Sequence, residues 1–305
     1  MTTAIDLFAG LGGFTTAAES IGVHVLWAAN HWPAAVEMHA ANHPGVAHVA
    51  QDLHQARWES VPSHDLLLAS PCCQGHSRAR GKDRPGSDAS RSTAWAVVSC
   101  AEYHRPEVAI VENVPEFLSW VLFPSWSAAM QALGYSLAPH IIDAADCGVP
   151  QHRERLFIVA TRSAAPLDLG SPGAEHSHAA DIVDFDAGVW SQVETDRRST
   201  ATLRRVANGR ASFGERFVMP YYGSGSGLTG RSLARPLGTV TTRDRWALVD
   251  GDRMRMLTVG EYRAAMGFPA DYRLPVRRHD AIHMLGNAVA PPAAAWVIGR
   301  ALEAA

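Results

Sequence analysis

The feature that most limits the possible folds is a repeated alternation of short apolar runs with stretches of helical apolar spacing. Apolar runs that predict strands occupy residues 4–8, 23–29, 47–50, 66–69, 108–111, 137–143 and 156–161. Stretches that predict helices occupy residues 14–22, 33–42, 93–103 and 126–133. Because this rhythm is typical of strands joined by helices that cover both faces of a sheet, it predicts an α/β fold with a mainly parallel, doubly wound sheet.

The amino-acid composition of the chain changes near residue 163. Gly, Ser, Asp, His and Arg then dominate as far as residue 230, and the apolar periodicity fades. Helical spacing resumes at Thr258–Met266 and predicts a last helix over Pro292–Leu302. We therefore expect three parts, namely a main domain over residues 1–162, a small second lobe over residues 163–234, and a segment over residues 235–305 that returns to the main domain.

The composition indicates a water-soluble protein with a sizeable core, since 47% of its 305 residues are hydrophobic. The four cysteines form no CxxC pattern, so we expect neither a disulfide framework nor a metal site. The N-terminus has no basic segment ahead of an apolar one, and no run reaches the roughly 18 apolar residues of a membrane span. We therefore expect a cytoplasmic protein with no membrane segment.

The net charge of −3 argues against indiscriminate binding of polyanions, but the basic residues are clustered. One cluster comprises Arg78, Arg80, Lys82, Arg84 and Arg91. A second comprises Arg197, Arg198, Arg204, Arg205, Arg210 and Arg216. On charge alone each cluster fits either a solvated face, which is the commoner case, or a nucleic-acid contact.

The stretch from Asp65 to Ser77 reads DLLLASPCCQGHS, an apolar run that stops at Pro71 and is followed by two cysteines. In open α/β sheets, ligands and chemistry lie at the carboxyl ends of the strands. A cysteine there is either a small buried side chain or a nucleophile, and the residue type alone favours the first.

Three glycines, Gly10, Gly12 and Gly13, follow the first predicted strand and precede a predicted helix. They permit positive φ angles and a close approach of the backbone to a ligand. The pattern is not GxGxxG, so a pyrophosphate cradle is not indicated and the turn alone is weak evidence for a nucleotide-like cofactor.

Several short motifs occur in one order along nearly the whole chain. They are FAGLGG from Phe8, PCCQ from Pro71, ENV from Glu112, QHRER from Gln151, RPLGTVT from Arg235 and GNAV from Gly286. In sequence and order they resemble the motifs of the cytosine-5 DNA methyltransferases, which use S-adenosylmethionine. The resemblance implies a Rossmann-like methyltransferase sheet, with residues 1–162 as the catalytic, cofactor-binding domain and residues 163–234 as the target-recognition region.

The resemblance also implies a covalent mechanism. C5 of cytosine is a poor nucleophile, so a thiolate must first add to C6, and Cys73 holds the position of that nucleophile. Glu112 is the candidate acid at N3 of the base, and Arg155, with Arg153 alongside, would hold O2. For the removal of the C5 proton we expect an ordered water.

The remaining predicted contacts follow from the same motifs. The cofactor is expected at Phe8, Ala9, Gly10, Leu11, Gly12, Gly13, Asn30, His31, Asp52, Leu53, Pro71, Asn287, Ala288 and Val289. DNA is expected at Gln74, Ser77, Arg78, Arg80, Lys82, Arg84 and Arg91, on a basic loop that could close over a base flipped out of the duplex.

Three residues depart from the family pattern. Cys72 stands where the family usually has proline, His76 where Phe is common, and Asn30 where an acid usually binds the cofactor ribose. The departures leave the candidate catalytic groups in place, although they fit an altered acceptor such as an already modified cytosine.

Three functions stay open. The first is a DNA cytosine-5 methyltransferase of bacterial or phage type, acting as a monomer on double-stranded DNA and with a restriction endonuclease as a possible partner. The second is an RNA methyltransferase with the same core. The third is a non-catalytic nucleic-acid-binding homologue, suggested by the residues at positions 30, 72 and 76.

Overall fold

The computed structural model describes residues 1–72, 93–221 and 229–304, and the chain divides into two units. Unit 1 comprises Met1–Asp143, Glu154–Gly173 and Ala288–Ala305. Unit 2 comprises Ala144–Arg153 and Ala174–Asn287. Residues 235–287 thus belong to unit 2 and residues 288–305 to unit 1, whereas the sequence predicted one returning segment. The functional roles assigned to these parts remain predictions.

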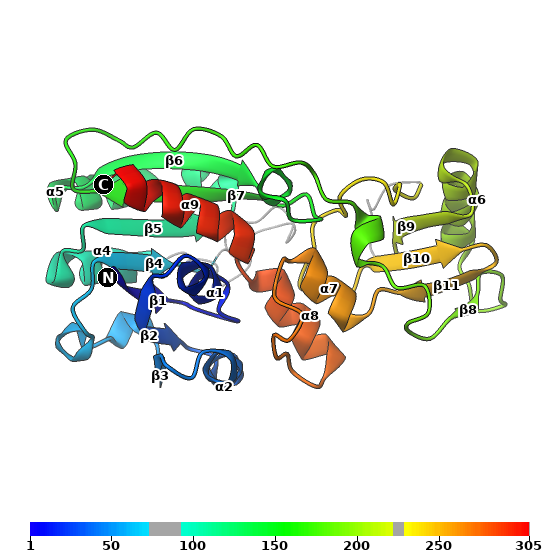
Figure 1. Cartoon of the computed structure of the whole chain (residues 1–305), viewed down its shortest axis with the longest axis horizontal. Coiled ribbons are helices and arrows are strands. Elements are labelled where there is room, and N and C mark those ends of the chain that lie inside the picture. Colours follow the sequence, from blue (N-terminus) through cyan, green and yellow to red (C-terminus); the bar gives the residue numbers. More distant parts are fainter. Residues whose placement is uncertain (73–92, 222–228, 305) are drawn as a thin grey trace. The chain divides into compact units, whose positions relative to one another are not determined.

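A seven-stranded sheet in the order β3-β2-β1-β4-β5-β7-β6 is the centre of unit 1 (Figure 1). Its strands are β1 (Thr3–Leu7), β2 (His24–Asn30), β3 (Ala47–Ala50), β4 (Leu66–Ala69), β5 (Val108–Asn113), β6 (Ser136–Asp143) and β7 (Glu154–Thr161). The first five are parallel, and β7 runs antiparallel between β5 and β6. The predicted α/β class with a mainly parallel sheet is confirmed.

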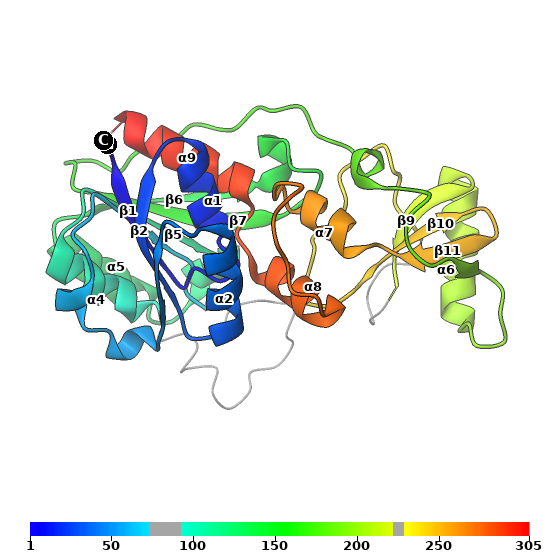
Figure 2. The ribbon, with the colours of Figure 1, turned by 60° about the horizontal axis from the view of Figure 1, so that its bottom comes forward.

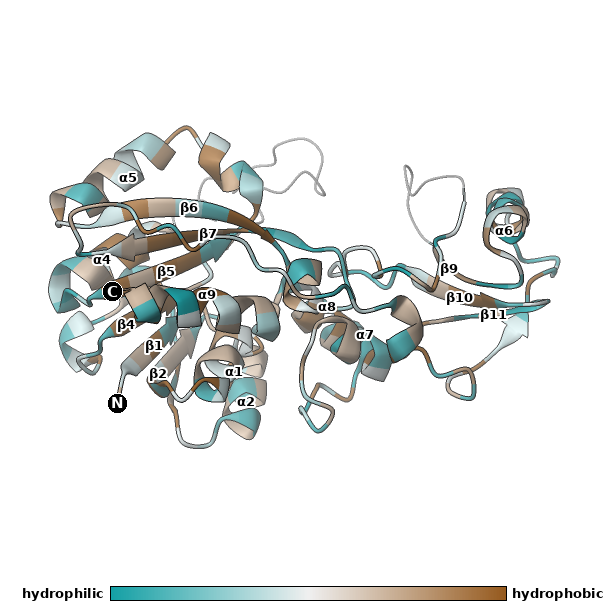
Figure 3. Ribbon diagram, turned by 45° about the horizontal axis from the view of Figure 1, so that its top comes forward, coloured by the Kyte–Doolittle hydropathy of each residue, from teal (hydrophilic) through white to brown (hydrophobic). Residues whose placement is uncertain are grey.

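Helices cover both faces of this sheet, as expected for strands that are apolar throughout (Figure 3). They are α1 (Gly13–Ser20), α2 (Pro33–Asn42), α4 (Trp95–His104), α5 (Phe123–Ala132) and α9 (Pro291–Ala304). Val97 of α4 and Trp126 of α5 share a core with Ile5 and Leu7 of β1. Since side chains alternate along a strand, Ala4 and Asp6 point to the opposite face, which α1 and α9 cover (Figure 1).

Unit 2 contains a four-stranded antiparallel sheet in the order β8-β11-β10-β9 (Figure 1), and Figure 2 shows β9, β10 and β11 from another side. Its strands are β8 (Ser191–Gln192), β9 (Arg216–Pro220), β10 (Trp246–Asp250) and β11 (Arg253–Met256). Its helices are α6 (Thr200–Phe213), α7 (Val259–Ala265) and α8 (Arg278–Asn287). Val206 of α6 packs with Phe217 of β9 in a small core of its own, so this lobe has more regular structure than the sequence indicated.

The stretch Arg278–Ala304 is long and apolar enough to cross a membrane by length and composition alone, which the sequence analysis did not anticipate. Of its most apolar window, 72% is buried inside the fold, and α9 packs against α1. A mostly buried core helix passes the same test, so the stretch is weak evidence for a membrane span.

Candidate active site

The glycine turn lies at the carboxyl end of β1. Phe8, Gly10 and Gly12 all have positive φ angles, of 60°, 54° and 97°. A positive φ is unusual for a phenylalanine and costs on the order of 1–3 kcal/mol, so contacts with its surroundings must offset that cost. The turn is closed by a hydrogen bond from the Gly12 N–H to the Ala9 carbonyl, 2.8 Å long.

Gly13, the first residue of α1, packs directly on the backbone of Val289. A Cβ atom at position 13 would come 2.1 Å from the Val289 carbonyl oxygen. The two motifs that are farthest apart along the chain, FAGLGG and GNAV, therefore meet in unit 1. Asn287 is exposed and is the last residue of unit 2, whereas Ala288 and Val289 are buried in unit 1.

The Ser70-Pro71-Cys72 segment follows β4, the strand next to β1. The Ser70 hydroxyl donates a 3.2 Å hydrogen bond to the Phe8 carbonyl and so ties this segment to the glycine turn. The backbone N–H of Cys72 donates to the Thr93 hydroxyl at 3.1 Å. A proline at position 72 has no N–H and could not make this bond, so the departure from the family pattern supplies an anchor of a different kind.

The ENV motif ends β5, the next strand along the sheet. Asn113 is buried, and its side-chain amide donates to the Pro71 carbonyl at 3.1 Å and accepts from the Val114 N–H at 2.9 Å. This clasp joins the ends of β4 and β5. It also places Glu112, the preceding residue, at the carboxyl end of β5, next to the Pro71-Cys72 segment.

Glu112 pairs with Arg155 on the antiparallel strand β7. The Arg155 Nε lies 3.1 Å from the Glu112 Oε1, and the two side chains are 18% and 9% exposed. The Arg155 Nη1 also donates to the Glu154 carbonyl at 2.7 Å, which fixes the guanidinium plane. A largely desolvated carboxylate and guanidinium thus lie together at one edge of the sheet, where electrostatic interactions are stronger than in water.

Arg153 occupies a different environment. It is 2% exposed within unit 2, and its two Nη groups donate to the carbonyls of Val240 and Gly286, each at 3.0 Å. Gln151 bonds the Ala265 carbonyl at 2.9 Å and also accepts from the Val240 N–H. Of the two arginines predicted to be catalytic, Arg155 reaches Glu112, and Arg153 binds main-chain carbonyls.

The polar residues predicted to contact the cofactor mostly cap local structure. The Asn30 side-chain oxygen accepts from the Trp32 N–H at 2.9 Å, just before α2. The Asp52 carboxylate accepts from the His54 N–H at 3.0 Å. His31 and Asp52 are exposed, Leu53 is in the core, and Leu11 is buried in the turn.

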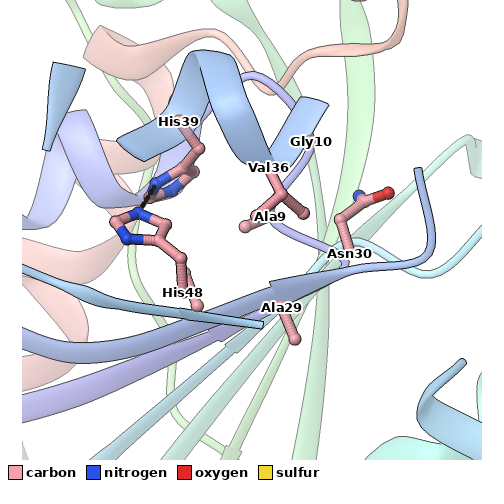
Figure 4. Close-up of a pocket in the computed structure, with 8 residues that line it drawn as sticks. Ala9, Gly10, Ala29, Asn30, Val36, His39 and His48 are labelled. Atoms are coloured by element: carbon pink, nitrogen blue, oxygen red, sulfur yellow. Dashed lines mark hydrogen bonds between the residues drawn. The ribbon is translucent and has the colours of Figure 1, made fainter. Parts of the chain in front are cut away.

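A pocket opens beside the glycine turn, between α2 and the strands β2 and β3 (Figure 4). Its lining residues are Ala9, Gly10, Ala28, Ala29, Asn30, Val36, His39 and His48. A Cβ at Gly10 would meet only one atom within 4 Å, the Phe8 oxygen at 3.7 Å, so the backbone here is open to a ligand. The empty space is about 140 Å³, too small for a nucleoside to lie inside it. The bare turn fits a ligand that lies against its backbone.

Cys73 and all of the residues predicted to contact DNA lie outside the described residues. The latter are Gln74, Ser77, Arg78, Arg80, Lys82, Arg84 and Arg91. The same holds for His76. Cys73 is nevertheless joined by one peptide bond to Cys72, whose backbone is anchored beside the Asn113 clasp.

Ser70, Thr93 and Asn113 hold the site together, and the sequence analysis gave none of them a role. Asn113 had a signal, because it follows Glu112 at the end of a buried strand. Thr93 had none, since it lies 21 residues from Cys72 along the chain.

Comparisons with known proteins indicate the family to which this chain belongs. The family model for C-5 cytosine-specific DNA methylase matches residues 2–303. The chain is 28% identical to the Type II methyltransferase M.HhaI of Haemophilus parahaemolyticus, over 93% of this chain and 89% of that protein. It is 27% identical to the Type II methyltransferase M.HpaII of Haemophilus parainfluenzae, over 95% and 86%.

A solved structure shares the fold. A putative DNA modification methyltransferase encoded within an Escherichia coli prophage superimposes with a TM-score of 0.73 at 19% identity, covering 100% of this chain and 99% of that chain. The family match over nearly the whole sequence, together with the site at the sheet edge, identifies this chain as a member of the C-5 cytosine-specific DNA methylase family.

Proposed function

We propose that this protein transfers a methyl group from S-adenosylmethionine to C5 of a cytosine in double-stranded DNA, through a transient covalent bond from Cys73. The observation that carries the proposal is the Glu112–Arg155 pair, next to the Asn113 clasp on Pro71. A thiol one residue beyond Cys72, a carboxyl group and a guanidinium are the groups that this chemistry requires.

In the proposed reaction the Cys73 thiolate attacks C6 of the target cytosine. Electron density then moves toward N3 and O2 of the ring, and Glu112, in its protonated form, donates a hydrogen bond or a proton at N3. The Arg155 guanidinium stabilises O2, and its ion pair with Glu112 keeps the two groups at a fixed separation. The C6 adduct makes C5 nucleophilic. After methylation of C5, an ordered water takes the C5 proton, the Cys73 thiolate leaves C6, and N3 returns any proton it received to Glu112.

When it is bound, S-adenosylmethionine supplies a methyl group on a positively charged sulfur that C5 can attack. The residues proposed to hold the cofactor are the backbone from Phe8 to Gly13, Pro71 and Val289. Support comes from the two positive-φ glycines and from the contact between Gly13 and Val289. The Asn30 side chain already bonds the Trp32 N–H, so we assign its second lone pair to a ribose hydroxyl.

The target base must leave the duplex to reach a thiol at a sheet edge, at a cost of roughly a few kcal/mol for unstacking and unpairing. Phosphate contacts are proposed for the arginines of the 73–92 segment and of unit 2. We further propose that the protein works in the cytoplasm as a monomer on DNA, with a cognate endonuclease as a possible partner.

The reaction is tested with methyl-labelled S-adenosylmethionine and duplex DNA from a host that lacks cytosine methylation, followed by digestion to nucleosides. We expect label in 5-methyl-2′-deoxycytidine with the wild type and with Cys72→Ser, and none with Cys73→Ser. Label retained by Cys73→Ser and lost by Cys72→Ser would overturn the assignment of the nucleophile.

A second substrate separates the alternatives. Duplex DNA and tRNA are offered together, and label is counted in each. Label in tRNA alone would favour the RNA methyltransferase, whereas cofactor binding without transfer to either would favour a non-catalytic homologue.

A further inference from the structure

Four polar side chains form a continuous hydrogen-bonded chain beneath the glycine turn. Thr15 Oγ1 lies 2.9 Å from Asp6 Oδ2, and His39 Nε2 lies 3.0 Å from the same hydroxyl. His39 Nδ1 lies 2.8 Å from His48 Nε2, the contact drawn in Figure 4. Asp6 and Thr15 are 0% exposed and His39 is 1% exposed, while His48 is half-buried, so the chain runs from the core toward solvent.

The proton count along this chain allows two arrangements. Each of its three hydrogen bonds needs one proton, and Thr15 and a neutral His39 supply one each. The third must come from an end of the chain, that is, from a protonated Asp6 or from the Nε2 of His48. The direction of all three bonds therefore depends on whether Asp6 holds a proton.

Asp6 is placed to titrate. Among the described residues, its Oδ1 has no hydrogen-bond partner, which is costly for a buried carboxylate. Burial raises the pKa of Asp6 to about 7, although the Thr15 hydrogen bond opposes the shift. In the register of the sheet, Asp6 lies between Ala28 and Leu68, so β2 and β4 bring no charge to it.

The other titratable groups nearby belong to α1, α2 and β3. His43, the residue after α2, lies against His39 with the ring centroids 4.7 Å apart and bonds Glu19 of α1 at 2.7 Å. Burial together with His43 and His48 lowers the pKa of His39. α9 also packs on α1, and its charged residues Arg300 and Glu303 pair with each other. In the described part of the chain no group of three or more His, Cys, Asp or Glu side chains is arranged to hold a metal ion, so we treat these histidines as hydrogen-bonding groups.

The four hydrogen-bonded side chains lie on both sides of the turn that is proposed to hold the cofactor. Asp6 precedes Phe8 by two residues, and Thr15 follows Gly13 by two. His39 and His48 line the same pocket as Ala9 and Gly10 (Figure 4). A change of charge at Asp6 therefore changes the electrostatic potential on both sides of the turn and along one wall of the pocket.

We propose that Asp6, Thr15, His39 and His48 form a proton relay through which unit 1 takes up one proton beneath the glycine turn, so that cofactor affinity depends on pH. Uptake shifts one proton along each bond, from solvent to His48 Nδ1, from His48 Nε2 to His39 Nδ1, from His39 Nε2 to Thr15, and from Thr15 to Asp6. The link from this proton uptake to cofactor affinity rests on the proposed function. An ionised Asp6 attracts the cationic cofactor, and a protonated one does not.

The relay is tested without cofactor by recording the tautomer of His39 with nitrogen-15 NMR between pH 9 and pH 6. In the wild type we expect the proton to move from Nε2 to Nδ1 as the pH falls. In Asp6→Asn and in Thr15→Val, His39 should keep one tautomer throughout, whereas Thr15→Ser keeps the hydroxyl and should restore the change. A wild-type His39 with a single tautomer, or a change that survives in Asp6→Asn, would overturn the proposal.

The consequence for the cofactor is measured by calorimetric titration with S-adenosylmethionine at pH 8.5 and pH 6. We expect the wild type to bind at least about fivefold more tightly at the higher pH, in the usual range of coupling between sites, and Asp6→Asn to lose that ratio. Titration of the ligand itself is common to both proteins and cancels in the comparison. His64→Gln, which alters a buried histidine outside the relay, should keep the wild-type ratio.

The two proposals fail in different ways. A wild type that binds no S-adenosylmethionine at either pH contradicts the proposed function but leaves the tautomer result standing. Equal affinities at the two pH values, alongside normal methyl transfer, contradict only the coupling to the cofactor.

Discussion

Glu112 is the residue whose geometry most directly supports catalysis, because it is largely buried and touches Arg155 at the sheet edge. In Glu112→Gln the amide oxygen can still accept from the Arg155 Nε, so the local structure should persist. The amide cannot give up a proton to N3, and we expect kcat to fall by about 10² to 10⁴ with little change in cofactor affinity. Single-turnover methyl transfer and calorimetric titration measure the two quantities separately.

A matched control lies near the other end of β5. Glu107 pairs with Arg162 at 3.8 Å, and both side chains are well exposed. Glu107→Gln removes the same charge from the same side-chain type away from the site, and kcat should stay within about twofold, as is usual for surface substitutions. Equal losses in the two variants would show that the effect of Glu112→Gln is not catalytic.

Asp6 makes the stability of the fold depend on pH. The folded state holds the Asp6 proton up to a pH of about 7, because burial raises its pKa from 3.8. The folded state therefore binds more protons than the unfolded state between these values, and stability falls as the pH rises through that window. A rise in pKa of this size corresponds to about 4 kcal/mol of stability that the wild type loses between pH 4 and pH 7. Asp6→Asn has no such proton to lose and should not show this loss.

Urea denaturation of the wild type and of Asp6→Asn at pH 5, 6, 7 and 8 measures this difference. The histidines act in the opposite direction, since burial lowers the pKa of His64 to about 4 and their stabilisation is lost as the pH falls below 6.5. His64 lies outside the relay and is present in both proteins, so its contribution cancels in the comparison. A constant difference between the two proteins at all pH values would contradict the assignment to Asp6.

Helix α1 begins with a glycine that the packing requires. A methyl group at position 13 would lie 2.1 Å from the Val289 carbonyl oxygen, a backbone atom that cannot rotate away. We expect Gly13→Ala to destabilise unit 1 by about 1–3 kcal/mol and to weaken cofactor binding. Gly45 has open space around it and no positive φ, so Gly45→Ala is the matched control and should change neither property.

One of the bonds that hold the segment after β4 comes from Thr93, which lies 21 residues after Cys72 in the sequence. Removing the Thr93 hydroxyl in Thr93→Val frees the Cys72 N–H, while keeping the side-chain shape. If this bond positions the adjoining nucleophile, kcat should fall by about tenfold, comparable to the loss of one hydrogen bond of about 1 kcal/mol, with stability little changed. Thr93→Ser should retain the wild-type rate, and an equal loss in both variants would point to a packing effect.

The strands of unit 1 were predictable because each is a short apolar run closed by a turn, and the βαβ rhythm left few alternatives. α6 was not predicted, although it is 14 residues long. Its sequence carries three arginines and few large apolar side chains, and only Thr202, Val206 and Gly209 are buried. Its apolar stripe is too narrow to stand out from a polar segment, and it is completed by Phe217 from β9.

The structure brings predicted site residues close together where their motifs lie on neighbouring strands, whereas contacts between distant segments were not predicted. Glu112 and Arg155 lie on neighbouring strands, so motif order and sheet topology together bring them near each other. Arg153 lies two residues from Arg155, yet its bonds to Val240 and Gly286 depend on tertiary packing within unit 2 that no local pattern encodes. The Asp6 relay had one signal, an acidic residue inside an otherwise apolar strand.

Across the whole molecule the charge is divided unequally between the units. Unit 2 carries 17 arginines and 14 acidic residues, a net charge of +3, although the chain as a whole carries −3. Several of those arginines are engaged in ion pairs, such as Arg255 with Glu261 and Arg278 with Asp244. Because unit 2 is positively charged and the whole chain is negatively charged, we expect unit 2 to bind a polyanion locally. The net charge of the protein is then a poor guide to its affinity for DNA.

This division predicts a specific response to salt. Arg204 is exposed on α6, and if it contacts a phosphate, Arg204→Gln should weaken binding of duplexes of any sequence and reduce the slope of log K against log salt by about 0.9. Arg57, which is 82% exposed in unit 1 and pairs with Glu59, is the control. Fluorescence anisotropy with random-sequence duplexes between 50 and about 200 mM salt measures both slopes. If Arg57→Gln lowers the slope as much as Arg204→Gln does, binding follows total charge and unit 2 is not the surface that DNA contacts.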